Sequence, residues 1–135
     1  MIKEYTIYNT GEITGLYAAV GWSAYTDDPE TLRKGFENSL LVLADYEDGK
    51  LAGLIRVVGD AYTVIFIQDI IVDPAYQCRG IGSKLLKQVL ERYSGVRQIE
   101  LVTDNTPGTT AFYRSLGFRD LSDIGCCGFM RINAP

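Results

Sequence analysis

The sequence predicts a mixed α/β fold with a mostly antiparallel sheet, and two changes in hydrophobic periodicity carry this prediction. Apolar residues recur with helical spacing up to residue 37, follow strand-like patterns through residues 39–72, and return to helical spacing at residues 82–93. A strand, a helix and another strand in succession predict a parallel strand pair in the second half. The chain has 135 residues, the usual size of one domain, so we expect a single domain over residues 1–135.

The first quarter of the chain predicts one strand and two helices. Residues 3–7 alternate weakly between apolar and polar, as a strand does. Thr10 can cap a helix that Gly21 would end. A second helix should begin at Asp28, because Pro29 then takes the first helical position. The apolar faces of these helices comprise Ile13, Leu16, Tyr17, Val20, Leu32 and Phe36.

The middle of the chain predicts an antiparallel meander. Residues 39–46 and 51–58 have strand-like patterns, and the turn at residues 47–50 contains a glycine that can adopt a positive φ. Residues 62–72 are rich in β-branched and aromatic side chains and predict a third strand. Three consecutive strands with short connections therefore form the body of the predicted sheet.

The rest of the chain predicts alternating helices and strands. An amphipathic helix is expected over residues 82–93, a short strand over residues 98–103 and a short helix over residues 109–116. Residues 118–132 should hold two final strands around a loop. The strand at 62–72 and the strand at 98–103 are the expected parallel pair.

Composition excludes several classes of function. The net charge of -4 argues against a broad basic surface for nucleic acid. The chain has no histidine, which removes the usual general base, and it has no Cys/His cluster with zinc spacing. Neither a signal peptide nor a membrane-spanning stretch is apparent, and an odd number of cysteines suits a reducing compartment. We therefore expect a cytoplasmic protein with no metal, no nucleic-acid partner and no membrane partner.

A glycine-containing segment at residues 73–83 joins a strand to a helix. Gly80 and Gly82 allow the backbone to approach a ligand, and the free N–H groups at the helix start form an anion site that suits a pyrophosphate. Arg79 adds positive charge. From the glycines alone, a strand-to-helix turn without ligand is equally compatible. The segment lacks the Lys-Ser/Thr ending of a Walker A loop and the third glycine of the dinucleotide fingerprint.

Two motifs resemble those of the GNAT family of N-acetyltransferases. Gln77-x-x-Gly80-x-Gly82, after the strand that ends in Val72, resembles the acyl-CoA loop of that family. Asn105 followed by the run at residues 111–118, Ala-Phe-Tyr-Arg-Ser-Leu-Gly-Phe, resembles the next helix of the family. The resemblance covers essentially the whole chain. It implies the acyl-CoA N-acyltransferase fold, with a central pair of parallel strands that splay apart, and acetyl-CoA as the acyl donor.

The resemblance also implies a set of residues that bind acetyl-CoA. The strand before the loop would pair with the pantetheine arm, the loop would hold the pyrophosphate, and Asn105 would bond the arm. Phe112 is placed at this site too, although packing under the sheet is the interpretation that we favour for its ring. Cys78 stands where the family often has glycine. The implied residues are Ile70, Ile71, Val72, Gln77, Cys78, Arg79, Gly80, Ile81, Gly82, Ser83, Asn105 and Phe112.

For catalysis, the resemblance assigns Tyr113 as the acid that protonates the leaving thiolate; an aromatic packed under the sheet is the alternative. Many relatives carry a glutamate base where this chain has Gln68, which cannot take a proton. Asp69 is the candidate base here, with a structural role as the slightly preferred alternative. Strict alternation puts Gln68 and Asp69 on opposite faces, although a bulge in this strand would re-aim either side chain. Deprotonation through water to solvent is a third possibility.

The acceptor should be the primary amine of a small molecule or peptide. The resemblance places its pocket between the loop after the first helix, which holds Trp22 and Tyr25, and the last two strands, which hold Asp120 and Asp123. A direct transfer of acetyl from acetyl-CoA to such an amine is the expected activity. The alternative is a non-catalytic module that binds acyl-CoA. Relatives often pair through their last strands, so a homodimer is a further expectation.

Overall fold

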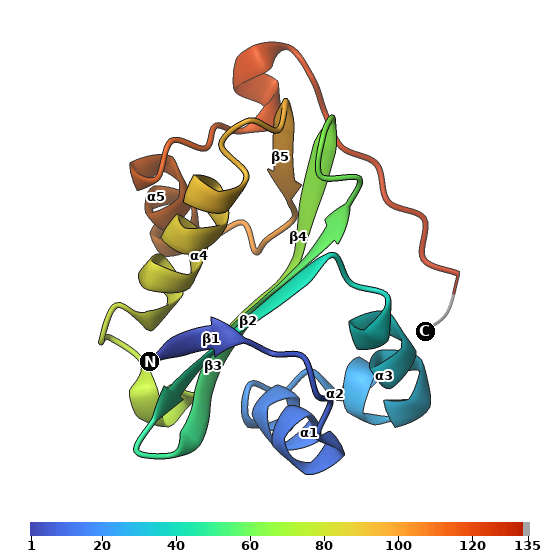
Figure 1. Ribbon diagram of the computed structural model, residues 1–135. Helices are drawn as coiled ribbons and strands as arrows, with labels where there is room; N and C mark the ends of the chain where they lie inside the picture. The colour runs from blue at the N-terminus through green and yellow to red at the C-terminus, as the bar shows by residue number, and fades with distance from the viewer. Residues whose placement is uncertain (134–135) are drawn as a thin grey trace. The chain divides into compact units, whose positions relative to one another are not determined.

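The computed structural model describes residues 1–133 and contains two compact units, Met1–Leu101 and Val102–Pro135 (Figure 1). The first unit is built on a five-stranded sheet with the order β1-β2-β3-β4-β5. All neighbours are antiparallel except β4 and β5, which are parallel as predicted. The strands are β1 (Ile2–Glu4), β2 (Leu41–Glu47), β3 (Lys50–Gly59), β4 (Val64–Val72) and β5 (Gln98–Leu101).

The hairpin between β2 and β3 shows why the middle of the chain folds as predicted. Asp48 and Gly49 form its turn with φ values of 52° and 76°. Positive φ at both central residues gives the turn a twist that matches that of paired strands. The parallel pair, in contrast, lies at one edge of the described sheet rather than at its centre.

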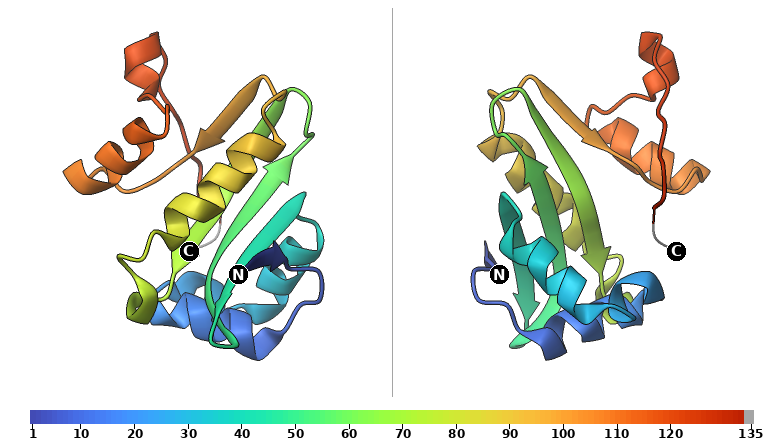
Figure 2. Two further views of the ribbon diagram at one scale, coloured as in Figure 1. Left: turned by 60° about the vertical axis from the view of Figure 1, so that its left-hand side comes forward. Right: turned by 90° about the vertical axis from the view of Figure 1, so that its right-hand side faces the viewer.

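Helices cover both faces of this sheet (Figures 1 and 2). One face carries α1 (Thr10–Ala19), α2 (Ser23–Thr26) and α3 (Pro29–Glu37), and the other carries α4 (Ile81–Arg92). Successive residues of β3 show the division. Leu54 packs in a core with α1 and α3, whereas Gly53 faces α4. The core on the α1–α3 side comprises Ile13, Leu16, Tyr17, Leu32, Phe36, Val42, Leu54 and Ile71.

Capping side chains fix where the first helices begin. Asp28 accepts a hydrogen bond from the backbone N–H of Thr31, with Pro29 at the first helical position, as predicted. The cap of α1 is Asn9, whose side chain accepts from the N–H of Glu12, so the prediction of Thr10 was wrong by one residue. Helix α2 was not predicted, because four residues are too few to show a helical period.

The second unit contains α5 (Pro107–Ser115) and a short 3₁₀ helix, η2 (Leu121–Ile124). The prediction of two final strands over residues 118–132 is wrong for this structure. No residue within 102–133 belongs to a strand.

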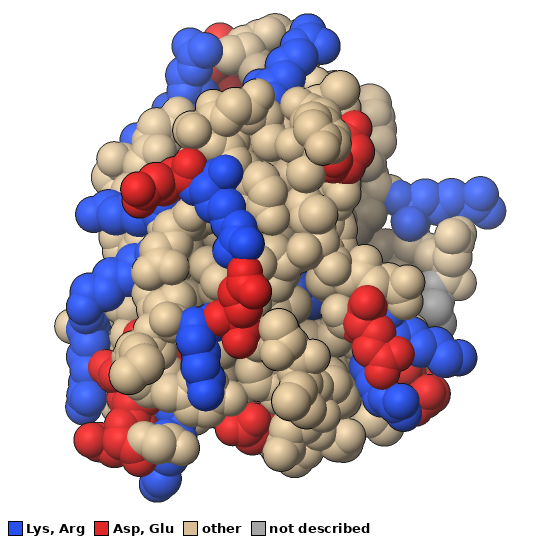
Figure 3. All heavy atoms as spheres, in the orientation of Figure 1, with Lys and Arg blue, Asp and Glu red and all other residues tan. Residues whose placement is uncertain are grey.

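Over residues 1–133, no helix is both long and apolar enough to span a bilayer. On the face shown in Figure 3, basic and acidic side chains are interspersed rather than gathered into a patch of one sign.

Candidate functional site

The backbone of β4 has an open edge along its second half. Strand β5 pairs with β4 only from Val64, opposite Gln98, to Ile67, opposite Leu101. From Asp69 to Val72, β4 pairs with β3 alone, and Gln68 pairs with neither strand. The two parallel strands thus separate midway along β4, as the resemblance implied, and leave backbone groups available to a ligand that can add as a strand does.

Alternation shows which groups face this edge. The N–H of Asp73 donates to the carbonyl of Ala52 in β3, at 2.8 Å. Because hydrogen-bonding direction alternates along a strand, Ile71 also directs its N–H towards β3, whereas Ile70 and Val72 direct theirs to the open edge. Of the three strand residues predicted to bind the pantetheine arm, Ile70 and Val72 direct their backbone groups to this edge, where the Val72 carbonyl accepts from the Gln77 side chain. The side chain of Ile71 is buried in the core.

The loop after β4 turns tightly into α4. A 3₁₀ turn, η1 (Pro74–Tyr76), leads to Cys78 and Gly80, which adopt φ values of 64° and 76°. The side chain of Gln77 donates to the carbonyl of Val72, at 3.4 Å, and ties the loop to the end of β4. These contacts place the loop directly beside the open edge.

The N-terminus of α4 offers free N–H groups. Gly80 is its cap and supplies no side-chain hydrogen bond, and the first bond within the helix is from Lys84 N–H to the Gly80 carbonyl. In residues 1–133, no acceptor contacts the N–H groups of Ile81, Gly82 and Ser83. With the helix dipole, these groups can bind a phosphate.

Glycine suits positions 80 and 82 of the loop for two different physical reasons. A Cβ on Gly80 would meet open space, but the positive φ of this residue disfavours any side chain. A Cβ on Gly82 would lie 3.6 Å from Cγ2 of Val72, an ordinary contact. Packing therefore does not require glycine at position 82, whereas close approach of a ligand to the helix backbone would.

Cys78 occupies a left-handed backbone conformation, which glycine adopts without strain and other residues rarely adopt. This explains why a glycine suits the position. The thiol is exposed and free. Arg79, next in the chain, places its guanidinium 5.2 Å from the ring centroid of Tyr76, which holds its positive charge at the loop.

A β-bulge interrupts β4 just before the open edge. Arg56 in β3 pairs with Asp69, but the next residue, Val57, pairs with Ile67, so Gln68 has no partner. The bulge puts the side chains of Gln68 and Asp69 on the same face of the sheet, the face covered by α1 and α2. Gln68 bonds to Tyr25 of α2, and Asp69 bonds to Tyr17 of α1. Strict alternation, which assigned them to opposite faces, was therefore wrong, and re-aiming by a bulge is what the structure shows.

Asp69 is buried, and one of its two carboxylate oxygens accepts two hydrogen bonds from side chains. The residue is 2% exposed, and Oδ2 accepts hydrogen bonds from the Tyr17 hydroxyl at 2.7 Å and from Nε of Arg56 at 2.8 Å. Burial, and then the charge of Asp69, raise the pKa of the Tyr17 hydroxyl, so it remains a donor. This geometry favours the structural interpretation of Asp69 over its assignment as a base.

The predicted acceptor residues form an aromatic cluster. The ring centroid of Tyr17 lies 5.3 Å from that of Tyr25 and 5.9 Å from that of Trp22. Trp22 is 37% exposed, and the Gln68 amide donates to the Tyr25 hydroxyl at 3.1 Å. The cluster therefore connects the exposed indole to the bulge beside the open edge.

The other predicted site residues belong to the second unit. Tyr113 is 9% exposed, and its ring packs edge-on against Phe112 and Phe118, at 5.0 and 5.8 Å between centroids. Burial raises the pKa of its hydroxyl, against an opposing hydrogen bond with Thr103, so the proton is retained at neutral pH. Asn105 is exposed in the segment before α5.

Two predicted acceptor acids are paired within this unit. Arg114 forms ion pairs with Asp120 and Asp123, the second at 3.0 Å. Both carboxylates are therefore engaged on the surface of the second unit. No group of three or more potential metal ligands occurs in residues 1–133.

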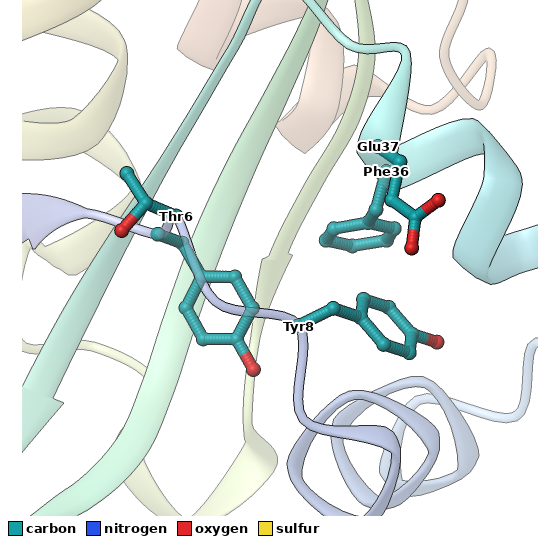
Figure 4. A pocket seen from close by; sticks show the side chains of 5 residues that line it. Thr6, Tyr8, Phe36 and Glu37 are labelled. Atoms are coloured by element: carbon teal, nitrogen blue, oxygen red, sulfur yellow. The ribbon is translucent and has the colours of Figure 1, made fainter.

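A small hollow of about 130 Å³ lies between the β1–α1 connection and α3 (Figure 4). Tyr8 and Phe36 meet edge-to-face across it, with Glu37 beside them. The Tyr8 hydroxyl has no hydrogen-bond partner in the part of the chain that the structure describes. The hollow holds little more than a few water molecules and lies apart from the open edge of β4.

Sequence reasoning missed two residues of the site. Tyr17 was assigned only to the apolar face of a helix, and Arg56 was not assigned at all. A signal was present for Arg56, because an arginine within the apolar run of β3 needs a buried partner.

The comparisons with known proteins agree with the geometry. An acetyltransferase of the GNAT family from Streptococcus pneumoniae TIGR4 superposes with a TM-score of 0.89 and 38% identity, over 100% of this chain and 98% of that one. A curated N-acetyltransferase described as ycf52-like, from Prochlorococcus marinus, is 31% identical over 90% of this chain. Serotonin N-acetyltransferase 2 of rice is 28% identical over 86%.

The chain spans 69% of the length of the Prochlorococcus relative and 59% of the rice relative. Residues 5–118 match the family described as the acetyltransferase (GNAT) family. The open edge of β4, the loop at Gln77–Ser83 and this match lead to one conclusion: the chain belongs to the GNAT family of acetyltransferases.

Proposed function

We propose that the chain is an N-acetyltransferase that moves an acetyl group from acetyl-CoA directly to a primary amine. The observation that carries this proposal is the continuity of two binding surfaces. The open edge of β4 runs into the loop at Gln77, which runs into the uncapped N-terminus of α4. An extended pantetheine arm and a pyrophosphate follow each other in acetyl-CoA in the same way.

The residues present fit each part of this donor. Free N–H groups of Ile81, Gly82 and Ser83 suit the pyrophosphate, and Gly82 leaves room for it. The backbone groups of Ile70 and Val72 suit the amides of the arm. The N–H of Ile70 is then the group that would donate to the acyl carbonyl oxygen and stabilise negative charge developing there.

Two proton movements complete the proposed reaction. The attacking amine must lose a proton, and the departing thiolate must gain one. Tyr113 retains its proton at neutral pH and is the proposed donor. Asp69 is occupied by Tyr17 and Arg56, so we assign deprotonation of the amine to water.

The acceptor is an amine, but membership of the family does not specify the rest of the acceptor molecule. The names of relatives point to different acceptors: serotonin and glucosamine 6-phosphate for two rice proteins, while one from Mycobacterium tuberculosis is named an N-alpha-acetyltransferase. Fold does not determine the substrate. The aromatic cluster of Tyr17, Trp22 and Tyr25 is the proposed contact surface for the rest of the acceptor molecule.

An acceptor panel tests the proposal. Acetyl-CoA is incubated with the protein and each of serotonin, glucosamine 6-phosphate, spermidine and a peptide with a free N-terminal alanine, and released CoA thiol is measured. We expect amine-dependent release with at least one acceptor, and a mass gain of one acetyl group on that amine. Tight binding of acetyl-CoA without transfer to any amine would instead support a non-catalytic acyl-CoA-binding module.

A further inference from the structure

A charged pair is buried beside the bulge of β4. Arg56 and Asp69 are 6% and 2% exposed, and their Nε and Oδ2 atoms lie 2.8 Å apart. Burial lowers the pKa of Arg56, but the charge and hydrogen bond of Asp69 more than offset this, so the pKa of Arg56 is raised and its guanidinium keeps its positive charge. A buried ion pair is often no more stabilising than apolar side chains of the same size. Stability alone is therefore a poor explanation for it.

Helix α3 makes space for the arginine. A Cβ on Gly35 would lie 3.1 Å from Nη1 of Arg56, tighter than an ordinary contact. The guanidinium carbon lies 5.2 Å from the ring centroid of Phe36, and Nη1 lies 3.5 Å from Oγ of Ser39. These neighbours hold the guanidinium beside Asp69, where its Nε donates to the carboxylate.

Asp69 joins this fixed arginine to both sides of the site. It follows Gln68, the bulged residue, and precedes Ile70, whose N–H faces the open edge. Its Oδ2 also holds the hydroxyl of Tyr17, whose ring supports those of Trp22 and Tyr25. A displacement of Asp69 would therefore move the bulge and the aromatic cluster together.

We propose that Tyr17, Arg56 and Asp69 are positioning residues for the acceptor: they hold the bulge at Gln68 and the Trp22–Tyr25 surface in the arrangement that receives the amine. This inference rests on the proposed function, since it specifies how the acceptor side of that site is held. Asp69 acts here through its ion pair and its bond to Tyr17, not as a proton acceptor. Small errors of placement near a reacting group are enough to cost large factors in rate.

Two variants and a matched control test this. Tyr17→Phe removes the hydroxyl and keeps the ring, and Asp69→Asn removes the charge. Tyr5→Phe is the control, because Tyr5 also donates its hydroxyl to a carboxylate, that of Glu12 at 3.2 Å, away from the bulge. For the amine of the panel with the highest kcat/KM, both test variants should raise the amine KM by roughly tenfold. The KM for acetyl-CoA and the shape of the pH profile should stay unchanged in both test variants. The amine KM should stay unchanged in Tyr5→Phe.

A second readout needs no acceptor. Trp22 is the only tryptophan of the chain, so the quenching of its fluorescence by acrylamide reports on the aromatic cluster. Quenching should increase about twofold or more in Tyr17→Phe and Asp69→Asn and stay unchanged in Tyr5→Phe.

Each possible outcome has a defined meaning. An unchanged amine KM in the folded Tyr17→Phe and Asp69→Asn enzymes overturns the proposal. A collapse of kcat in Asp69→Asn, together with loss of the acidic limb of the pH–rate profile, also overturns it, because this result identifies Asp69 as a base. If no amine of the panel reacts, the proposed function fails, and Trp22 quenching alone then decides the positioning role. Should Asp69→Asn not fold, Tyr17→Phe carries the test.

Discussion

The donor side and the acceptor side of the candidate site differ in the groups that form them: backbone groups on one side and side chains on the other. On the proposed donor side, backbone groups at the open edge of β4 and at the start of α4 would face the ligand. On the proposed acceptor side, the contacts would come from the side chains of Trp22, Tyr25 and Gln68. Backbone groups are the same in every residue, whereas side chains differ. One fold can therefore keep a common donor while its acceptor changes with a few substitutions, and the following predictions test this division.

The largest effect should come from blocking the backbone on the donor side. Gly82→Asp places bulk and negative charge where the pyrophosphate would lie, while the space beside Val72 allows the fold to survive. Wild-type protein should bind acetyl-CoA with a Kd of about 1 μM, and the variant should bind at least about a hundredfold more weakly. Calorimetry measures both. Gly95→Asp is the control, with the same change of charge at a glycine that has open space around it. Normal binding by a folded Gly82→Asp protein would show that the donor site lies elsewhere.

Removing the proposed acid should separate chemistry from binding. Tyr113→Phe keeps a ring that packs against Phe112 and Phe118 and deletes the proton donor. We expect kcat to fall about a hundredfold and the Kd of acetyl-CoA to stay within about twofold. Phe112→Leu, which alters packing and leaves the hydroxyl, is the comparison. If kcat survives in Tyr113→Phe while chemistry is rate-limiting, the ring serves packing alone.

The pH profile should follow the acceptor rather than a carboxylate of the enzyme. An alkylammonium has a pKa near 10, so the free-amine fraction rises about tenfold per pH unit below that value. The raised pKa of Tyr113 keeps its acid form present over the same range, and its loss would lower activity only above that raised pKa. Measured kcat/KM should therefore climb towards the pKa of each of two amines. Profiles that coincide for amines of different pKa would argue for a dedicated base.

The smallest effect should come from the strained residue of the loop. Cys78→Gly relieves a positive φ of 64° and should raise the free energy of unfolding by about 1 kcal/mol. Chemical denaturation measures this change. Acetyl-CoA affinity should change by no more than about twofold, because the thiol is exposed and the backbone path is kept. Cys78→Ala, which keeps a Cβ, should not gain this stability.

The loop after β4 and the starts of α3 and α4 were predictable from sequence because their determinants are local. Glycines in a strand-to-helix turn and a capping Asp28 before Pro29 act through residues next to them in the chain. The parallel pair followed from a connection rule of equal simplicity. The sequence alone left the bulge at Gln68 as one possibility among others. The bulge depends on the register between β3 and β4, and register is a property of two segments.

The remaining misses have the same origin. Asp69 accepts from both Arg56 and Tyr17, and these bonds join three segments that no local pattern connects. Helix α2 is too short to carry a period. The predicted strands after Phe118 are absent from the described residues; a strand needs a partner segment, and the pattern within one segment does not specify that partner. Patterns within a segment are thus reliable, and relations between segments need the structure.

The open edge of β4 has a consequence for the protein when no donor is bound. Unpaired strand groups are a template on which any extended chain can add, including one from a partly unfolded copy of the same protein. A donor that occupies the edge removes this template and also stabilises the folded state by mass action, by roughly 2.7 kcal/mol when its concentration is a hundred times its Kd. We therefore expect acetyl-CoA, bound as proposed, to suppress aggregation of the protein, and we expect aggregation in its absence to begin along Gln68–Val72.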